Sequence, residues 1–267
     1  MDRPIGMFDS GFGGLTVARA VIDVLPQEHL VYIGDTGRYP YGSRPQSEVR
    51  QFAHQIAWSL VKDFDVKAIV VACNTASAAA LDELEGELPV PVIDVVAPGA
   101  RALVHATRSG TVGVIGTVGT IGSGSYDRAV TATGANVQLV SAACPGFVEF
   151  VERGQISGDE IHILAERLLA PVLAAGVDAL LLGCTHYPYL ASVIADVMGP
   201  DVTLVSSAIE TALVTRAVLT AEGLIRTPGG EPAEHRFLSS GDITWFADLG
   251  GRLLGPELRD AAQWRHD

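Results

Sequence analysis

Two cysteines stand at matching places in two similar stretches of the sequence. Cys73 lies in "KAIVVACNTAS" (67–77) and Cys184 lies in "DALLLGCTHYP" (178–188). In each stretch an apolar run typical of a strand ends at the cysteine, and the polar residues behind it can open a helix. Ligands of open α/β sheets bind outside the carboxyl ends of strands, so we expect both thiols to lie where a binding site is built.

A pair of such thiols predicts a particular reaction. A thiol at a helix start is close to unpaired N–H groups and to the positive end of the helix dipole, which favour the thiolate. If two thiols lie on opposite sides of a small molecule, one can remove a proton from one face while the other donates a proton to the opposite face. The sequence therefore predicts inversion of a carbon centre without a cofactor.

Each thiol needs a neighbour that handles its proton, and two residues are candidates. Asp9 ends the first predicted strand, and His186 lies two residues after Cys184. Asp9 also fits a helix N-cap for the segment that starts near Gly14, and His186 also fits an ordinary core histidine. Both alternatives stay open from local sequence alone.

Other chemistries fit the same residues less well. The segment "GFGGLT" (11–16) has Thr16 where a dinucleotide fingerprint needs glycine. Zinc binding by Cys73, Cys184, His186 and Asp9 lacks the usual C-x-x-C or H-x-x-x-H pair. A cysteine hydrolase that used Cys184 and a histidine would leave Cys73 without a role.

Pyridoxal phosphate, which also serves amino-acid inversion, needs a Schiff-base lysine. The chain has only Lys62 and Lys67, and Lys67 begins the strand that Cys73 ends, at the opposite edge of the sheet. The sequence therefore predicts no pyridoxal phosphate and no metal. Cys144 has no counterpart in the other half of the chain, and we interpret it as structural.

The elements that must position these residues are short apolar strands alternating with amphipathic helices. Continuous apolar runs are typical of parallel strands covered on both faces. We expect strands near 4–9, 29–35, 67–73, 90–95, 111–117, 136–142, 178–184 and 201–206. Helices are expected over 14–26, 47–64, 97–110 and 157–176, where Pro171 should kink or end the last one. A loop over 226–235 precedes one more strand and helix, and the polar last dozen residues should fray.

Composition limits the classes of partner. The 267 residues are 48% hydrophobic and 18% charged, which suits two globular domains. A formal charge of -13 repels phosphate backbones, so general nucleic-acid or anionic-membrane binding is disfavoured and a small ligand is favoured. Neither a signal peptide nor a membrane span is recognisable, and three scattered cysteines give no disulfide framework, so we expect a cytoplasmic protein.

Five motifs together resemble glutamate racemase, the cofactor-independent enzyme that makes D-glutamate for peptidoglycan, within the aspartate/glutamate racemase superfamily. They are "MFDSGFGGLTV" (7–17), "YIGDTGRYPYGSR" (32–44), "VVACNTASA" (70–78), "GVIGTVGTI" (113–121) and "LLGCTHYP" (181–188). The resemblance implies two flavodoxin-like α/β domains related by pseudo-twofold symmetry, with the active site in the cleft between them. The first domain would comprise 1–97 plus 208–267, and the second 98–207.

The resemblance also implies a role for each matching residue. Cys73 resembles the base that acts on D-glutamate and Cys184 the base that acts on L-glutamate, with Asp9 and His186 as auxiliary groups. The substrate-binding residues it implies are Asp9, Ser10, Tyr41, Gly42, Asn74, Thr75, Thr117, Thr120, Glu152, Thr185 and His186. Hydroxyls, amides and helix-start N–H groups among them can hold a carboxylate, although simple capping explains Asn74, Thr75 or Thr185 equally well.

One stretch departs from the family pattern. After Cys144 the chain has Gly146 and Glu149 at two positions of the usual Leu-Phe-Val-Pro sequence, which leaves the alignment near Glu152 open. The resemblance further implies a homodimer, and a DNA gyrase interaction occurs in some members. Two other interpretations remain: a racemase for aspartate or a hydantoin, and a binding protein that senses a dicarboxylate.

Overall fold

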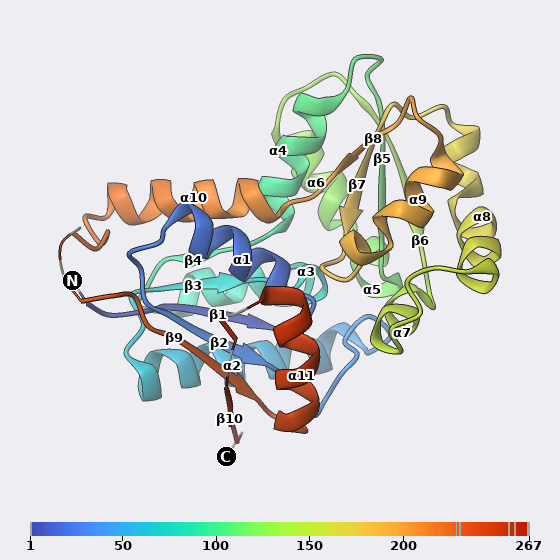
Figure 1. Cartoon of the computed structure of the whole chain (residues 1–267). Coiled ribbons are helices and arrows are strands. Elements are labelled where there is room, and N and C mark those ends of the chain that lie inside the picture. Colours follow the sequence, from blue (N-terminus) through green and yellow to red (C-terminus); the bar gives the residue numbers. More distant parts are fainter. Residues whose placement is uncertain (1, 228, 230, 256, 259, 266–267) are drawn as a thin grey trace. The chain divides into compact units, whose positions relative to one another are not determined.

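The computed structural model describes residues 2–227, 229, 231–255, 257–258 and 260–265. Strands and helices alternate along most of the chain (Figure 1). The chain forms two compact units, Met1–Val95 with Ala208–Asp267, and Val96–Ser207. The first unit is thus built from both ends of the chain.

The first unit contains a parallel sheet. Among the described residues it has six strands in the order β10-β9-β2-β1-β3-β4. Buried apolar residues fill β1, β2 and β3, as expected for strands covered on both faces. The strands are β1 (Ile5–Asp9), β2 (Leu30–Gly34), β3 (Ala68–Val71), β4 (Val92–Ile93), β9 (His235–Ser239) and β10 (Ala261–Gln263).

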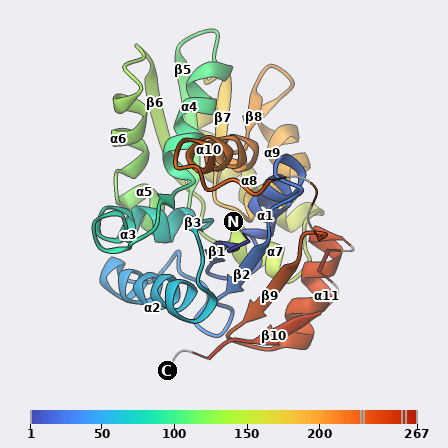
Figure 2. The ribbon, with the colours of Figure 1, turned by 90° about the vertical axis from the view of Figure 1, so that its left-hand side faces the viewer.

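Helices cover both faces of this sheet. The helices are α1 (Leu15–Val24), α2 (Gln46–Phe64), α3 (Asn74–Glu87), α10 (Ala208–Ala221) and α11 (Ile243–Leu254). Helix α2 packs with α3, whereas α1 packs with α10 and α11 (Figure 2). A buried cluster that includes Phe8, Val71, Tyr41 and Cys73 joins the sheet to α2 and α3. The first thiol therefore lies at the end of a fully packed core.

The second unit repeats this design with fewer strands. Its sheet is parallel, in the order β6-β5-β7-β8, with β5 (Thr111–Gly116), β6 (Gln138–Ala143), β7 (Ala179–Gly183) and β8 (Thr203–Val205). Helix α4 packs with α6, and α8 packs with α9. Its helical segments are α4 (Val96–Ala106), α5 (Val118–Gly122), α6 (Ser125–Ala132), α7 (Phe147–Glu152), α8 (Asp159–Ala174), the 3₁₀ turn η1 (Tyr187–Leu190) and α9 (Ala191–Met198).

The two sheets share one strand order. The order β2-β1-β3-β4 in the first unit corresponds to β6-β5-β7-β8 in the second, which is the flavodoxin-like arrangement. In this order β3 is equivalent to β7, so Cys73 and Cys184 follow equivalent strands. The order reverses between β1 and β3 and again between β5 and β7, and ligands of such sheets bind at these reversals.

The sequence predicts eight strands between residues 4 and 206, and the structure contains all eight as β1 to β8. Helix α8 continues through Pro171, so the expectation that this residue would end the helix was wrong. Within the last dozen residues, Ala261–Gln263 form β10 and Trp264 is buried, so the expectation of fraying was wrong for these residues. Among the described residues, no helix is both long and apolar enough to cross a bilayer.

Candidate active site

Cys73 occupies the N-cap position of helix α3. Its backbone is extended, and its sulfur accepts a hydrogen bond from the Ala76 N–H at 3.4 Å. The Ser77 hydroxyl donates to the Val71 carbonyl at 3.2 Å and so ties the first helical turn to the end of β3. The thiol is therefore held at the positive end of a 14-residue helix.

Asp9 lies beside this cysteine. Strands β1 and β3 pair up to Phe8 and Val71, so Asp9 and Cys73 follow neighbouring strands at one sheet edge. One Asp9 carboxylate oxygen accepts from the Gly14 N–H at 2.8 Å, while the other has no hydrogen-bond partner among the described residues. Asp9 thus supports the start of α1 with one oxygen, which leaves its other buried oxygen available to accept a further hydrogen bond.

The glycine-rich segment 11–16 is not a nucleotide fingerprint, but one of its glycines, Gly14, has a structural role. A Cβ atom on Gly14 would lie 2.7 Å from the Asp9 Cβ and 3.1 Å from the Ala72 Cβ. Only glycine lets the helix start approach the two strand ends this closely. The segment therefore positions a carboxylate.

Five other predicted residues belong to the first unit. Ser10, Asn74 and Thr75 are buried next to Asp9 and Cys73 in the chain. Tyr41 belongs to the same buried cluster as Cys73, but its hydroxyl donates to Asp35. Its neighbour Gly42 is half-buried and offers only backbone groups.

Cys184 has a histidine and a carboxylate aligned behind it. His186 Nδ1 lies 3.9 Å from the Cys184 sulfur, and His186 Nε2 lies 2.8 Å from Glu152 Oε1. Cys184 and His186 are almost completely buried, and the Glu152 side chain is 10% exposed. The structure thus brings together three of the predicted residues, one of which comes from a distant helix.

The protonation of His186 follows from these contacts. Burial alone would lower the pKa of His186, but its hydrogen bonds to Cys184 and Glu152 and the negative charges of both outweigh burial. They raise the pKa of His186 to about 10 from its ordinary 6.5. The imidazole is then an imidazolium at neutral pH, with both ring N–H groups as donors. It can hold or return a proton at the sulfur of Cys184.

Gly146 accounts for the unusual sequence after Cys144. It is the N-cap of α7 and has a φ of 94°, a left-handed conformation that glycine adopts without strain. The Tyr187 hydroxyl donates to the Cys144 carbonyl at 3.0 Å, which fixes this turn against the end of β7. The turn starts the short helix that places Glu152 beside His186, so the departure accommodates the site.

The remaining predicted residues lie at the ends of β5 and β7. Thr117 caps α5 by accepting from the Thr120 N–H at 3.1 Å, and its hydroxyl donates to the Thr120 hydroxyl at 3.0 Å. Because Gly116 pairs with Gly183, Thr117 and Cys184 follow neighbouring strands. Thr185 is buried directly after Cys184. The second unit thus has a polar cluster equivalent to that of the first.

Residues outside the site have other roles. Burial, with the nearby charge of Cys184, raises the pKa of Cys144 to about 12, as expected for an inert structural thiol. Lys67 forms a buried ion pair with Glu28, and the Lys62 ammonium lies 5.1 Å from the Trp58 ring centre. Within the described part of the chain, no group of three or more His, Cys, Asp or Glu side chains is placed to hold a metal ion.

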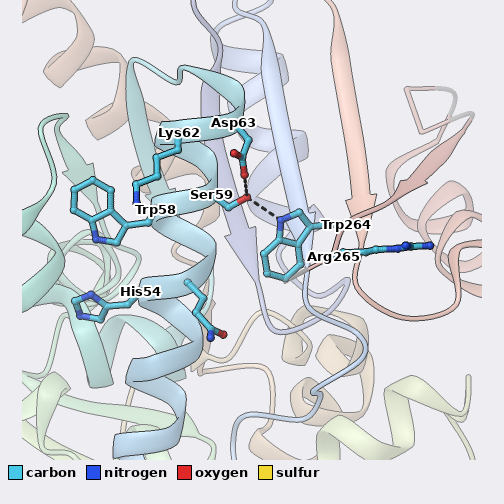
Figure 3. A pocket seen from close by; sticks show the side chains of 8 residues that line it. His54, Trp58, Ser59, Lys62, Asp63, Trp264 and Arg265 are labelled. Carbon is cyan, nitrogen blue, oxygen red and sulfur yellow. Dashed lines mark hydrogen bonds between the residues drawn. The ribbon is translucent and has the colours of Figure 1, made fainter. Parts of the chain in front are cut away.

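A separate pocket of about 440 Å³ runs along helix α2 (Figure 3). Ser59 lies between Asp63 and Trp264, donating to the first at 2.7 Å and accepting from the second at 2.9 Å. His54 also lines the pocket, and its ring nitrogen Nε2 lies 3.2 Å from Glu83, which is not part of the lining. Because these groups are engaged with one another, we place the active site at the strand ends.

Comparison with known proteins identifies the family of the chain. Residues 15–214 match the model of the Asp/Glu/Hydantoin racemase family. A glutamate racemase of Parafrankia sp. (strain EAN1pec) is 55% identical over 255 residues, which covers 96% of this chain and 92% of the relative. The chain belongs to the glutamate racemase family. It is accordingly an isomerase.

Solved structures of glutamate racemases have the same fold. One isoform from Bacillus anthracis has a TM-score of 0.91 at 40% identity, covering 99% of this chain and 97% of its own. The enzyme from Francisella tularensis, solved in complex with D-glutamate, has a TM-score of 0.91 at 34% identity, covering 100% and 98%. The fold predicted for a glutamate racemase, α/β with parallel sheets, is therefore confirmed.

Sequence reasoning misses two residues that lie near the site. The local sequence indicates no role for Ser77, yet this residue joins α3 to β3. Asp35 lies inside one of the family motifs with no assigned role, yet it binds the Tyr41 hydroxyl. An aspartate at the end of a predicted apolar strand (29–35) is the available signal for the second residue.

Proposed function

We propose that this chain interconverts L-glutamate and D-glutamate without a cofactor, using Cys73 and Cys184 as two bases on opposite faces of the α-carbon. The observation that supports this most is the equivalence of the two thiols. Each follows the third strand of a sheet with the same order, and each has a proton-handling neighbour, Asp9 or His186. A relative that is 55% identical in sequence bears the name glutamate racemase.

The proposed reaction moves one proton in each direction. From D-glutamate, the Cys73 thiolate takes the α-proton and becomes a thiol, leaving a carbanion-like centre. The Cys184 thiol donates a proton to the other face of that centre and becomes a thiolate, which gives L-glutamate. The reverse reaction begins with the Cys184 thiolate. Asp9 and His186 return the thiols to their starting protonation states between turnovers.

Neutral groups and helix starts would hold the substrate. Asn74 and Thr75 form the first turn of α3, where backbone N–H groups point away from the helix. An anionic carboxylate is stabilised at such a helix N-terminus without a lysine or arginine. We assign Ser10, Thr117, Thr120 and Thr185 to the same task, because they follow β1, β5 and β7 at the sheet edges where the thiols lie. Gly42, which lies between β2 and α2 directly after Tyr41, is assigned with them.

Solvent exchange tests the proposal directly. Purified protein is incubated with either enantiomer of glutamate in deuterated water without added cofactor. We expect both enantiomers to appear and the product to carry deuterium at the α-carbon. Absence of both inversion and exchange would refute the proposal. Parallel reactions with aspartate and with a hydantoin test the two related substrate classes.

We also propose that the D-glutamate serves peptidoglycan synthesis, as implied by the family resemblance. Restoration of growth in a bacterium that requires added D-glutamate would support this role. The homodimer and the gyrase interaction stay predictions. The mass of the protein in solution tests the first, and a gyrase supercoiling assay with added protein tests the second.

A further inference from the structure

Asp35 is a fully buried carboxylate outside the set of residues proposed to act in catalysis. It follows β2, and its backbone N–H donates to the Asp9 carbonyl at 2.9 Å, so it lies at the same sheet edge as the proposed base and its partner. A buried carboxylate is costly unless it is paired and hydrogen-bonded. The contacts of Asp35 therefore indicate what it holds in place.

Three side-chain donors meet this carboxylate. Arg38 Nε donates to Oδ2 at 2.7 Å, and the Tyr41 hydroxyl donates to the same oxygen. The Ser240 hydroxyl donates to Oδ1 at 2.6 Å. Arg38 and Tyr41 belong to the segment between β2 and α2, whereas Ser240 follows β9. Asp35 thus joins two chain segments that are far apart in the sequence.

Aromatic packing holds the arginine of this group. The Arg38 guanidinium lies 4.2 Å from the Phe52 ring centre and 5.7 Å from the Trp264 ring centre. Its Nη1 donates to Gln55 at 2.5 Å. The positive charge that neutralises Asp35 is thereby fixed between α2 and the end of β10.

Tyr41 connects this arrangement to the thiol. Its ring lies in the buried cluster that contains Cys73, and the ring centres of Tyr41 and Phe52 are 5.5 Å apart. The pKa of Tyr41 is raised by burial, by the charge of Asp35 and also by Cys73, so the tyrosine lies within electrostatic reach of the sulfur. Gly42 follows directly and is a proposed substrate contact.

We propose that Asp35 is a positioning residue, which holds residues 36–44 by its bonds to Arg38, Tyr41 and Ser240 so that Gly42 meets the substrate beside Cys73. This inference rests on the proposed function. In this proposal Asp35 acts through its bonds to these three residues and not by contact with the substrate or the thiol. Its loss should loosen substrate binding more than it slows the chemical step.

Asp35→Asn is the central variant. It keeps the shape, but an amide presents only one oxygen, so at least one of the three donors faces an NH₂ group. We expect the KM for glutamate to rise at least about tenfold with kcat reduced less than about threefold. A tenfold change corresponds to about 1.4 kcal/mol, which the loss of one hydrogen bond to a charged group can supply.

Asp178→Asn is the matched control. Asp178 also accepts from three donors, the Thr107 hydroxyl and two backbone N–H groups, but it precedes β7 and so lies at the opposite edge of its sheet. We expect a lower melting temperature with KM and kcat unchanged. A double-mutant cycle of Asp35→Ala with Tyr41→Phe should be strongly non-additive, because each change removes the hydrogen bond between these two side chains.

Several results would overturn the inference. These are an unchanged KM in Asp35→Asn, additive effects of Asp35→Ala and Tyr41→Phe, or the same kinetic pattern in Asp178→Asn. If Asp35→Asn does not fold, Ser240→Ala and Tyr41→Phe each remove one donor, and a wild-type KM in both refutes the role. Wild-type protein without turnover would refute the proposed function, whereas an active wild type with an unaffected Asp35→Asn refutes only this inference.

Discussion

Replacement of Glu152 by glutamine tests how the charge on His186 is maintained. Glu152 accepts from His186 Nε2 at 2.8 Å, and this hydrogen bond together with that to Cys184 raises the pKa of His186 to about 10. Glutamine keeps the size of the side chain and an acceptor oxygen but removes the negative charge. The variant therefore isolates the electrostatic contribution of the carboxylate.

The expected size of the effect follows from the strength of a charge-assisted hydrogen bond. Such a bond contributes roughly 1.5–3 kcal/mol, and one pKa unit corresponds to about 1.4 kcal/mol. The pKa of His186 should therefore fall by about 1–2 units in Glu152→Gln. Imidazole NMR signals followed from about pH 6 to pH 11 measure this pKa directly, since that range spans the ordinary and the raised value. The alkaline limb of kcat/KM should move to lower pH in the same variant.

Stability should change with pH in the same sense. A histidine with a raised pKa in the folded state contributes stability that is fully present below its unfolded pKa of about 6.5. That contribution is lost as the pH rises through the folded pKa of about 10. Urea unfolding of the wild type should therefore show a free energy that decreases from about pH 7 to pH 10. In Glu152→Gln this decrease should end about 1–2 pH units earlier.

Glu149→Gln is the matched control, because Glu149 is an exposed carboxylate on the same helix α7. It removes one negative charge without touching the contact between Glu152 and His186. An unchanged pKa of His186 in Glu152→Gln, or an equal fall in Glu149→Gln, would refute the reasoning.

Two further substitutions test the framework of the site. Lys67→Met leaves Glu28 as an unpaired buried charge and should lower the free energy of unfolding by about 3–5 kcal/mol, as measured by urea denaturation; a loss below about 1 kcal/mol would contradict this. Gly14→Ala places a methyl group 2.7 Å from the Asp9 Cβ and should lower kcat/KM at least about tenfold with a stability loss of about 1–3 kcal/mol. Gly86→Ala lies in helix α3, where the new Cβ would have no neighbour within 4 Å apart from its chain neighbours and the backbone of its own helix, and it should leave kcat/KM unchanged. Equal activity of both glycine variants would be contrary evidence.

The strands and the placement of the thiols can be predicted from the sequence for a simple reason. Continuous apolar runs identify buried parallel strands, and the position of a residue just after such a run fixes its edge of the sheet. Cys73 and Cys184 each follow such a run, so their edges of the two sheets are defined by the apolar pattern alone. Asp9 and Thr117, which end or follow β1 and β5, are placed by the same rule.

Contacts that depend on tertiary packing cannot be predicted in this way. Glu152 lies at the end of α7, which follows β6, whereas His186 follows β7, so their contact joins segments that are separate in the sequence. The local sequence around Glu152 is typical of an exposed helix residue. Trp264 is buried although its neighbours in the sequence are polar. Its indole N–H donates to the Ser59 hydroxyl on α2, a contact that the local sequence does not indicate. The Tyr41 hydroxyl donates to Asp35, and Asp35 forms an ion pair with Arg38. A pattern of apolar residues predicts neither of these polar contacts.

Proton exchange without inversion tests the two-base mechanism most directly. Cys73→Ser and Cys184→Ser are each incubated with L-glutamate and with D-glutamate in deuterated water, beside Cys144→Ala as a control for the loss of a buried thiol. We predict that both serine variants lose racemisation by at least about a hundredfold, given the usual contribution of a positioned acid or base. Cys73→Ser should still exchange the α-proton of L-glutamate faster than that of D-glutamate, and Cys184→Ser the reverse. The control should racemise normally. Equal, near-normal turnover of both serine variants, or the same exchange preference in both, would contradict the account.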